Sequence, residues 1–147
     1  MEFRIGHGYD VHALSDGLRN TGSHQMLLFL PGWFLLFLLG AAALGDIGLH
    51  FPDTSDDYAG IDSKLLLGRV AAMLRERGYE IGNVDCTIRM QRPKLRPHID
   101  AMRAAMAAAM GIDTDRVSVK ATTTERLGFE GREEGVSVSA VALIFRP

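Results

Sequence analysis

The chain has 147 residues, of which 47% are hydrophobic and 23% are charged, and its formal net charge is −2. These values predict one globular domain that buries a core of its own. Nucleic acid is not the expected partner, because the chain lacks basic runs and aromatic residues interleaved with basic ones. The one cysteine, Cys86, has no partner for an internal disulfide, which suits a reducing cytoplasm, and the opening MEFRIGHGYDVH lacks the apolar core of a signal peptide.

The first third of the chain contains a long apolar stretch. Phe3–His7 predicts a short strand that runs into a loop at residues 8–12, and residues 13–23 are polar and turn-like. Met26–Leu44 then reads MLLFLPGWFLLFLLGAAAL, close to the roughly 20 residues of a membrane-spanning helix. Pro31-Gly32 lies inside it, and a helix interior tolerates that pair poorly. Two interpretations follow: a buried core segment, or a membrane anchor over residues 26–44, with membrane association the less expected.

The rest of the chain alternates helical and strand patterns. Helical spacing of apolar residues, with Asp62 or Ser63 as the cap and Gly78 after the end, predicts a helix to Arg77. A second helix is predicted over residues 98–110, and strands over residues 81–90, 117–122 and 135–145. This order predicts an α+β fold for residues 1–147 as a single domain, with a sheet and helices packed on one of its faces.

Asp10 and His12 flank one residue directly after the first predicted strand. In an extended backbone, alternation places both side chains on the same side, where a carboxylate and an imidazole can bind one cation. An open zinc site with a position left for a substrate oxygen uses such ligands. The same triplet also fits a solvated pair or an ordinary hydrogen bond, so both interpretations stand at this point.

The segment Lys120–Glu125 reads KATTTE at the end of a predicted strand. Its three hydroxyls are phosphate donors, and its carboxylate is a hard oxygen ligand for Mg²⁺ or Mn²⁺. Thr122 and Glu125 also match the capping box of a helix beginning there. The two interpretations are compatible, because a helix N-terminus binds anions.

Two charged loops have a structural and a functional interpretation each. The segment Gly128–Gly135 is either a solvated connection or a place where Arg132 pairs with a phosphate or stabilises a subunit contact. The segment Pro93–Pro97 carries two cations between prolines, and it either cradles a diphosphate or forms a surface turn.

Several blocks, taken together and in this order, resemble the 2-C-methyl-D-erythritol 2,4-cyclodiphosphate synthase family. They cover most of the chain outside residues 15–39. The matching blocks are RIGHGYDVHAL from Arg4, GAAALGDIG from Gly40, FPDT from Phe51, DSKLLL from Asp62, GYEIGNVDCTI from Gly78, RPKLRPHIDAMR from Arg92 and VSVKATTTERLGFEGREEGV from Val117.

The resemblance implies a cytoplasmic homotrimer of α+β subunits with active sites between neighbours. The implied reaction belongs to the non-mevalonate (MEP) pathway of isoprene biosynthesis. It converts 4-diphosphocytidyl-2-C-methyl-D-erythritol 2-phosphate to 2-C-methyl-D-erythritol 2,4-cyclodiphosphate and releases CMP. The implied enzyme is a metal-dependent phosphorus–oxygen lyase that uses Zn²⁺ and a second divalent cation, Mg²⁺ or Mn²⁺. Two phosphates repel one another, so such an enzyme must neutralise and align them.

The resemblance also assigns roles to residues. The implied catalytic group is Asp10, His12, Asp46, Thr123 and Glu125, in which Asp10 and His12 are zinc ligands and Glu125 binds the second metal. The methylerythritol side of the pocket, which Asp10 also contacts, is implied to consist of Asp46, Gly48, Phe51 and Asp53. The cytidine and diphosphate side is implied to consist of Met90, Lys94, Leu95, Ala121, Thr122 and Thr123. Phe129 and Arg132 are the counterparts of substrate-contacting residues near the trimer axis.

Residues 15–39 depart from the family pattern. The stretch is about a dozen residues shorter than expected, judged against usual loop lengths. Counting back from Gly40 places His24 at the position of the substrate-loop histidine and Gly32 at that of the third zinc ligand. Three explanations stand: a corrupted reading of the gene, a genuine insertion and deletion that leaves an impaired enzyme able to bind cytidine nucleotides, or a rebuilt loop in which His24 is the third ligand.

Overall fold

The computed structural model describes residues 1–14, 35–52 and 61–147. A four-stranded sheet has the order β1-β4-β2-β3, with β1–β4 and β4–β2 antiparallel and β2–β3 parallel. Its strands are β1 (Glu2–Ala13), β2 (Glu80–Arg89), β3 (Val117–Thr122) and β4 (Gly135–Arg146). The helices are α3 (Leu35–Ala41), α4 (Ile47–His50), α5 (Ser63–Glu76), α6 (Ile99–Met110) and α7 (Gly128–Gly131), with 3₁₀ turns at Arg96–His98 and Thr114–Arg116.

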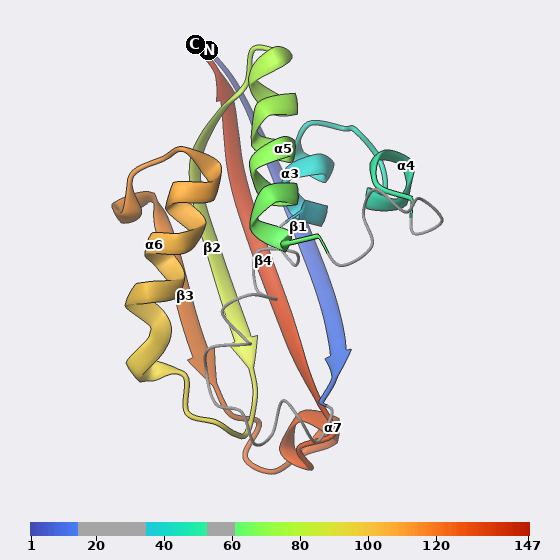
Figure 1. Ribbon diagram of the computed structural model, residues 1–147, viewed down its shortest axis with the longest axis vertical. Helices are drawn as coiled ribbons and strands as arrows, with labels where there is room; N and C mark the ends of the chain where they lie inside the picture. The colour runs from blue at the N-terminus through green and yellow to red at the C-terminus, as the bar shows by residue number, and fades with distance from the viewer. Residues whose placement is uncertain (15–34, 53–60) are drawn as a thin grey trace.

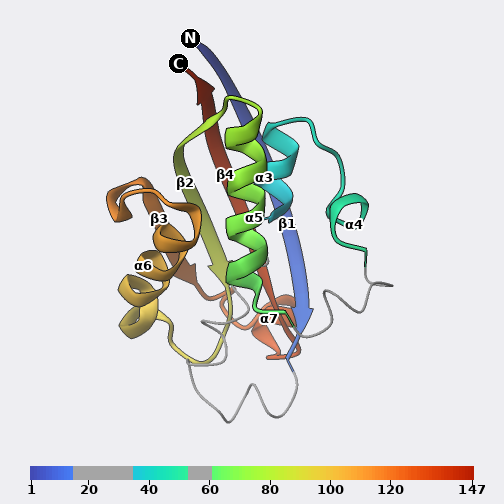
Figure 2. The ribbon, with the colours of Figure 1, turned by 45° about the horizontal axis from the view of Figure 1, so that its top comes forward.

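Helices α3, α5 and α6 pack on one face of the sheet, and α7 lies at the end where β4 begins (Figures 1 and 2). The α+β prediction is therefore confirmed, as are the helix that Asp62 caps and the strand at residues 117–122. The Asp62 side chain accepts a hydrogen bond from the Lys64 backbone N–H at 2.9 Å. Gly78 has a φ of +77° just after α5, a conformation that glycine adopts without cost.

Part of the apolar stretch is buried under α5 and against the sheet. Phe37, Leu38 and Leu39 of α3 are fully buried. The helix backbone lies directly on Gly6 of β1, where an added Cβ would overlap the Phe37 carbonyl oxygen. The core interpretation is thus confirmed for residues 37–39. Among the residues described, no helix has both the length and the apolar character needed to cross a membrane, and residues 26–34 lie outside the described part.

Two local predictions are wrong. The segment at residues 8–12 is not a loop, because β1 pairs with β4 along its whole length, from Glu2 opposite Arg146 to Ala13 opposite Gly135. The polar residues of this segment weaken the sequence pattern that predicts a strand. No helix begins at Thr122, because the backbone takes left-handed φ values of +55° at Glu125 and +63° at Arg126. An α-helix does not accommodate such residues, and α7 begins only at Gly128.

The face of the sheet opposite these helices exposes apolar side chains. The exposed fraction is 71% for Ile5, and the other members of this open face are Phe3, Tyr9, Val11 and Val141. Those of β1 share one side because they alternate with Gly6 and Gly8, which are buried. Several exposed apolar side chains on one face of a sheet favour an interaction site there.

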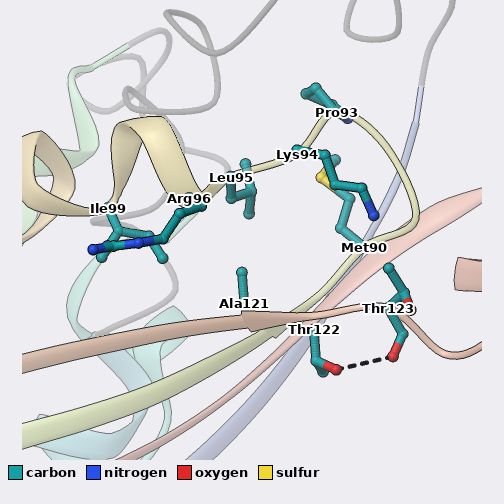
Figure 3. Close-up of a pocket in the computed structure, with 9 residues that line it drawn as sticks. All are labelled: Met90, Pro93, Lys94, Leu95, Arg96, Ile99, Ala121, Thr122 and Thr123. Carbon is teal, nitrogen blue, oxygen red and sulfur yellow. Dashed lines mark hydrogen bonds between the residues drawn. The ribbon is translucent and has the colours of Figure 1, made fainter.

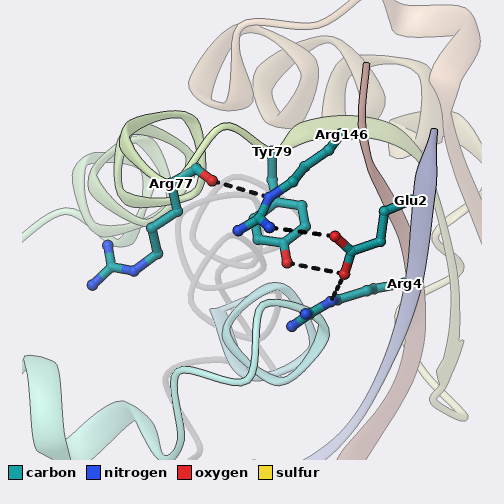
Figure 4. A network of polar contacts seen from close by, with 5 residues as sticks. All are labelled: Glu2, Arg4, Arg77, Tyr79 and Arg146. Atoms are coloured by element: carbon teal, nitrogen blue, oxygen red, sulfur yellow. Dashed lines mark hydrogen bonds and ion pairs between the residues drawn. The ribbon is translucent and has the colours of Figure 1, made fainter.

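A cluster of polar contacts closes the end of the sheet where both termini lie (Figure 4). Glu2 accepts a hydrogen bond from Arg4 at 2.7 Å and pairs with Arg146 at 3.3 Å. The Arg146 guanidinium lies 4.1 Å from the centre of the ring of Tyr79, which is itself buried. The hydrogen bond from Arg4 is the main reason that the pKa of Glu2 is lowered. The cluster joins β1, β4 and the start of β2.

Cys86 lies in the middle of β2 beneath the helices, and burial raises the pKa of its thiol to about 12. We expect the native protein to react negligibly with a thiol-specific disulfide reagent in mildly alkaline buffer, because the thiolate is the nucleophile. One thiol per chain should react after unfolding in urea. The absorbance of the released thiolate measures both states, and rapid reaction of the folded protein would contradict this placement.

Candidate active site

Asp10 and His12 lie next to one another near the end of β1. The Asp10 Oδ2 and His12 Nε2 atoms are 3.1 Å apart, which confirms that alternation brings the two side chains together. The other carboxylate oxygen of Asp10 accepts a hydrogen bond from the Val11 backbone N–H at 2.8 Å, which orients the carboxylate. The Asp10 and His12 side chains are 34% and 49% exposed, so a cation can approach from solvent.

One oxygen and one imidazole nitrogen are donors that zinc accepts, so the pair fits a zinc ion as part of its ligand set. Catalytic zinc sites usually have three protein ligands. Within residues 1–14, 35–52 and 61–147 no group of three His, Cys, Asp or Glu side chains is placed to hold a metal. His24, which one of the three explanations made the third ligand, lies outside these residues. Within the described residues, Asp10 and His12 are therefore a pair of donors that fits part of an open zinc site.

A pocket of about 160 Å³ lies between the loop after β2 and the end of β3 (Figure 3). All six residues predicted for the cytidine and diphosphate side line it: Met90, Lys94, Leu95, Ala121, Thr122 and Thr123. Three more residues line it. Pro93 and Arg96 belong to the proline-bounded loop for which diphosphate binding was one of two interpretations, and Ile99 was missed by sequence reasoning. The pocket therefore supports the binding interpretation of that loop.

The polar groups of the pocket suit an anion. Lys94 points toward the end of the pocket that Thr123 lines, and Arg96 lies beside Ile99 at the other end (Figure 3). In the described part of the chain Lys94 makes no ion pair with a carboxylate, so no carboxylate of that part competes with a ligand for its charge. Leu95 and Ile99 are buried and give the pocket an apolar wall. A cation, hydroxyls and an apolar wall match the needs of a phosphorylated ligand with a flat base.

Glu125 follows this pocket directly. Its backbone N–H donates to the Thr123 hydroxyl at 3.5 Å, and that hydroxyl lies 3.5 Å from the Glu125 carboxylate. Glu125 is exposed to solvent. Mg²⁺ is usually bound through one or two carboxylates together with substrate phosphates, so an exposed carboxylate beside a phosphate pocket fits that ion.

The two groups of site residues lie on opposite edges of the sheet. Register places Val11, Ser137, Arg89 and Thr122 in one row across β1, β4, β2 and β3. Neighbouring strands are about 4.8 Å apart, so the edge strands at this row are separated by about 14 Å. A single metal ion cannot bridge that separation, because its ligands lie about 2 Å from it. One chain therefore presents two half-sites: the pair on β1, and the pocket with Glu125 beyond β3.

The remaining predicted residues lie on short helices. Asp46 is the N-cap of α4, where its carboxylate accepts from the Ile47 backbone N–H at 2.8 Å, Gly48 lies within that helix, and buried Phe51 ends it. Asp53, predicted beside them, lies outside the described residues. The structure thus gathers three of the four predicted sugar-side positions on one helix.

The charged loop at residues 128–135 is not merely a solvated connection. It contains α7, whose Glu130 is buried and accepts a hydrogen bond from the buried Ser137 hydroxyl at 2.7 Å. Arg132 is exposed and pairs with Glu134 through two contacts of 2.9 and 3.0 Å, which raise its pKa. The ring of Phe129 packs against Gly135.

The model of the YgbB family matches residues 37–145. The chain belongs to the YgbB family. Within the YgbB family, this chain is 52% identical to the 2-C-methyl-D-erythritol 2,4-cyclodiphosphate synthase of Stutzerimonas stutzeri, over 98% of this chain and 99% of that protein. It is 54% identical to the synthase of Thioalkalivibrio sulfidiphilus, over 96% of each chain. The resemblance noted from the sequence is therefore confirmed.

Solved structures agree with the YgbB assignment. The bifunctional IspDF of Campylobacter jejuni is similar with a TM-score of 0.82 and 34% identity; the match covers 97% of this chain and 42% of that one. An IspF of Plasmodium falciparum in complex with CDP is similar with a TM-score of 0.78 and 25% identity, over 98% of this chain and 96% of that one. This member of the YgbB family therefore matches less than half of the bifunctional Campylobacter jejuni protein and nearly all of the Plasmodium falciparum one.

Proposed function

We propose that this protein converts 4-diphosphocytidyl-2-C-methyl-D-erythritol 2-phosphate to 2-C-methyl-D-erythritol 2,4-cyclodiphosphate and releases CMP. The observation that carries the proposal is the pocket of Lys94, Thr122 and Thr123 with Glu125 beside it. This half-site suits a nucleoside diphosphate, and a relative of the same fold binds CDP. Identity of 52% over nearly the whole chain with a synthase of this activity supports the same reaction here.

The pocket residues hold and align the substrate. The cytidine base packs against the apolar wall of Leu95 and Ile99, while Lys94 and the threonine hydroxyls donate to diphosphate oxygens. A 2-phosphate oxygen then attacks the β-phosphorus, a new phosphorus–oxygen bond forms, and the bond to CMP breaks. No protein nucleophile takes part. Alignment of two mutually repelling phosphates is the main task of the chain, because an oriented reaction avoids much of the entropic cost.

Two divalent cations complete the proposed site. Asp10 and His12 would hold Zn²⁺, and Glu125 would hold Mg²⁺ or Mn²⁺. When bound, such ions neutralise and polarise phosphate oxygens, which lowers the barrier to displacement at phosphorus. The donor sets agree with this division, because an imidazole suits zinc and a lone exposed carboxylate suits the harder ion.

The protein is proposed to act as a homotrimer with its active sites between neighbours. Two observations support this: the half-sites on opposite edges of the sheet, and the exposed apolar face of β1 and β4. In a head-to-tail ring, the β1 half-site of one subunit meets the β3 half-site of the next. Such a ring is closed when the rotations between neighbouring subunits add up to a full turn. We place the enzyme in the cytoplasm, where a free buried cysteine stays reduced. Its reaction there belongs to the non-mevalonate pathway.

Replacing Ile5 by Glu is expected to convert trimers into monomers. Ile5 is 71% exposed in the single chain, so the change spares the fold but buries a charge in the proposed interface. Sedimentation velocity measures the mass. Leu65→Glu on α5 is the matched control, since Leu65 is 59% exposed on the helical side and should leave the mass unchanged. A wild-type chain that sediments as a monomer at working concentrations would contradict the trimer.

The reaction itself is tested by measuring CMP release from the proposed substrate with Zn²⁺ and Mg²⁺ present. Release above the rate without protein supports the proposal. A second candidate is a catalytically impaired homologue that binds cytidine nucleotides. The comparisons do not support this candidate, because the similar curated proteins carry the name of the synthase. Saturable CDP binding, with substoichiometric zinc and no CMP release at high protein concentration, would establish that candidate instead.

A further inference from the structure

We infer that Gly131 is a positioning residue for Glu125. The inference rests on the proposed function, in which Glu125 binds the second divalent cation. The turn that carries Glu125 is an unusual one: Glu125 and Arg126 both take left-handed φ values, +55° and +63°. Residues with a Cβ disfavour that region, and two of them in succession need a neighbour that holds them there.

Gly131 supplies that neighbour. A Cβ on Gly131 would overlap the carbonyl carbon of Arg126, and it would lie 2.6 Å from the Arg126 Cα and 2.7 Å from its carbonyl oxygen. All three atoms belong to the backbone, so no side-chain rotation relieves the overlap. The last residue of α7 therefore lies directly on the left-handed backbone, and only glycine permits this approach.

α7 is itself fixed to the rest of the molecule. The Gly131 N–H donates to the Leu127 carbonyl at 3.1 Å, and the Leu127 N–H donates to the Thr124 carbonyl at 2.9 Å. The buried hydrogen bond from Ser137 to Glu130 ties the helix to β4. These contacts fix the position of α7. Because the turn at Glu125 and Arg126 packs against α7, the position of the helix also sets the position of the turn.

The position of the turn decides where the Glu125 carboxylate lies. In the observed turn the Thr123 hydroxyl meets both the Glu125 backbone N–H and its carboxylate at 3.5 Å. A displaced Arg126 backbone would carry Glu125 away from Thr123 and from the phosphate pocket. A metal bound through one protein carboxylate is sensitive to that displacement, because it has no second protein ligand to compensate.

The test measures Mn²⁺ binding without turnover. Free Mn²⁺ is followed by electron paramagnetic resonance in the presence of CDP, for the wild type and for Gly131→Ala. We expect Mn²⁺ affinity to fall roughly tenfold or more, as for other residues that orient a ligand, while metal-free CDP affinity changes little. The matched control is Gly40→Ala in α3, where an added Cβ meets no atom within 4 Å. Unchanged Mn²⁺ affinity in Gly131→Ala would overturn the inference.

A double-mutant cycle separates this inference from the proposed function. If Gly131 acts through Glu125, then Gly131→Ala causes no further loss of Mn²⁺ affinity in a Glu125→Gln background. Losses that multiply would overturn the positioning role. If Glu125→Gln alone leaves Mn²⁺ affinity intact, the metal role of Glu125 fails as well. Should Gly131→Ala not fold, Ser137→Ala loosens α7 from β4 and is expected to weaken Mn²⁺ binding in the same, smaller way; no weakening would count against the inference.

Discussion

Glu125→Gln is expected to lower the rate of CMP release by roughly 10²- to 10³-fold, equivalent to about 3–4 kcal/mol of lost transition-state stabilisation. The amide keeps the size of the side chain but no longer binds a hard divalent cation well. The cation acts most strongly on the charge that develops at the leaving phosphate, so CDP affinity should fall far less than turnover. Steady-state kinetics and calorimetric CDP binding measure the two quantities separately.

The control for this experiment is Glu76→Gln at the end of α5, an exposed glutamate far from the pocket in the chain and in the fold. It should leave both quantities unchanged. Equal losses of turnover and nucleotide affinity in Glu125→Gln would show that Glu125 merely helps to bind the ground state. Restoration of part of the rate at high Mn²⁺ concentration would strengthen the assignment.

His12→Ala is expected to reduce bound zinc to well below one ion per chain and turnover by on the order of 10³-fold, because the imidazole is one of only two described zinc donors. The variant should fold normally, since the His12 side chain is 49% exposed on an edge strand. Zinc content is measured by mass spectrometry of the metal and turnover by CMP release.

His98→Gln serves as the matched control, because His98 precedes α6 and makes no capping bond through its side chain. That variant should retain zinc. Full zinc occupancy and full turnover in His12→Ala would remove the pair on β1 from the site and leave only the nucleotide pocket. Zinc lost from both variants alike would indicate adventitious binding.

Much of the fold could be predicted because local patterns were strong. Helix α5 has a capping aspartate, a periodic apolar face and a terminal glycine, and all three signals agree with the observed helix. Strand β1 was predicted too short because its last residues are polar. Its true length depends on pairing with β4, which lies at the other end of the chain. The register between two strands that lie far apart in the chain cannot be predicted from the sequence of either strand alone.

The site residues also divide into those that local motifs predict and those that depend on tertiary packing. The six pocket residues were predicted by resemblance of whole motifs. Pro93 and Arg96 lay in a loop with two open interpretations, and Ile99 was not predicted, because only the packing of the loop and α6 beside β3 brings these residues to the pocket. The left-handed turn at Glu125 and Arg126 could not be predicted, because neither residue type indicates one. Its cause is the approach of Gly131, a contact that exists only once α7 has packed.

The contact between α3 and Gly6 has a consequence for the divergent part of the chain. On one side of that part, the Leu14 N–H donates to the Glu134 carbonyl at 2.9 Å. On the other side, the α3 backbone lies on the strand that carries Asp10 and His12. The two flanking segments are therefore attached at separate points of the sheet edge: Leu14 beside the start of β4, and α3 on Gly6 of β1. Every pair between β1 and β4 is formed by residues outside the intervening segment, from Glu2 with Arg146 to Ala13 with Gly135, so the register of the sheet is set without it.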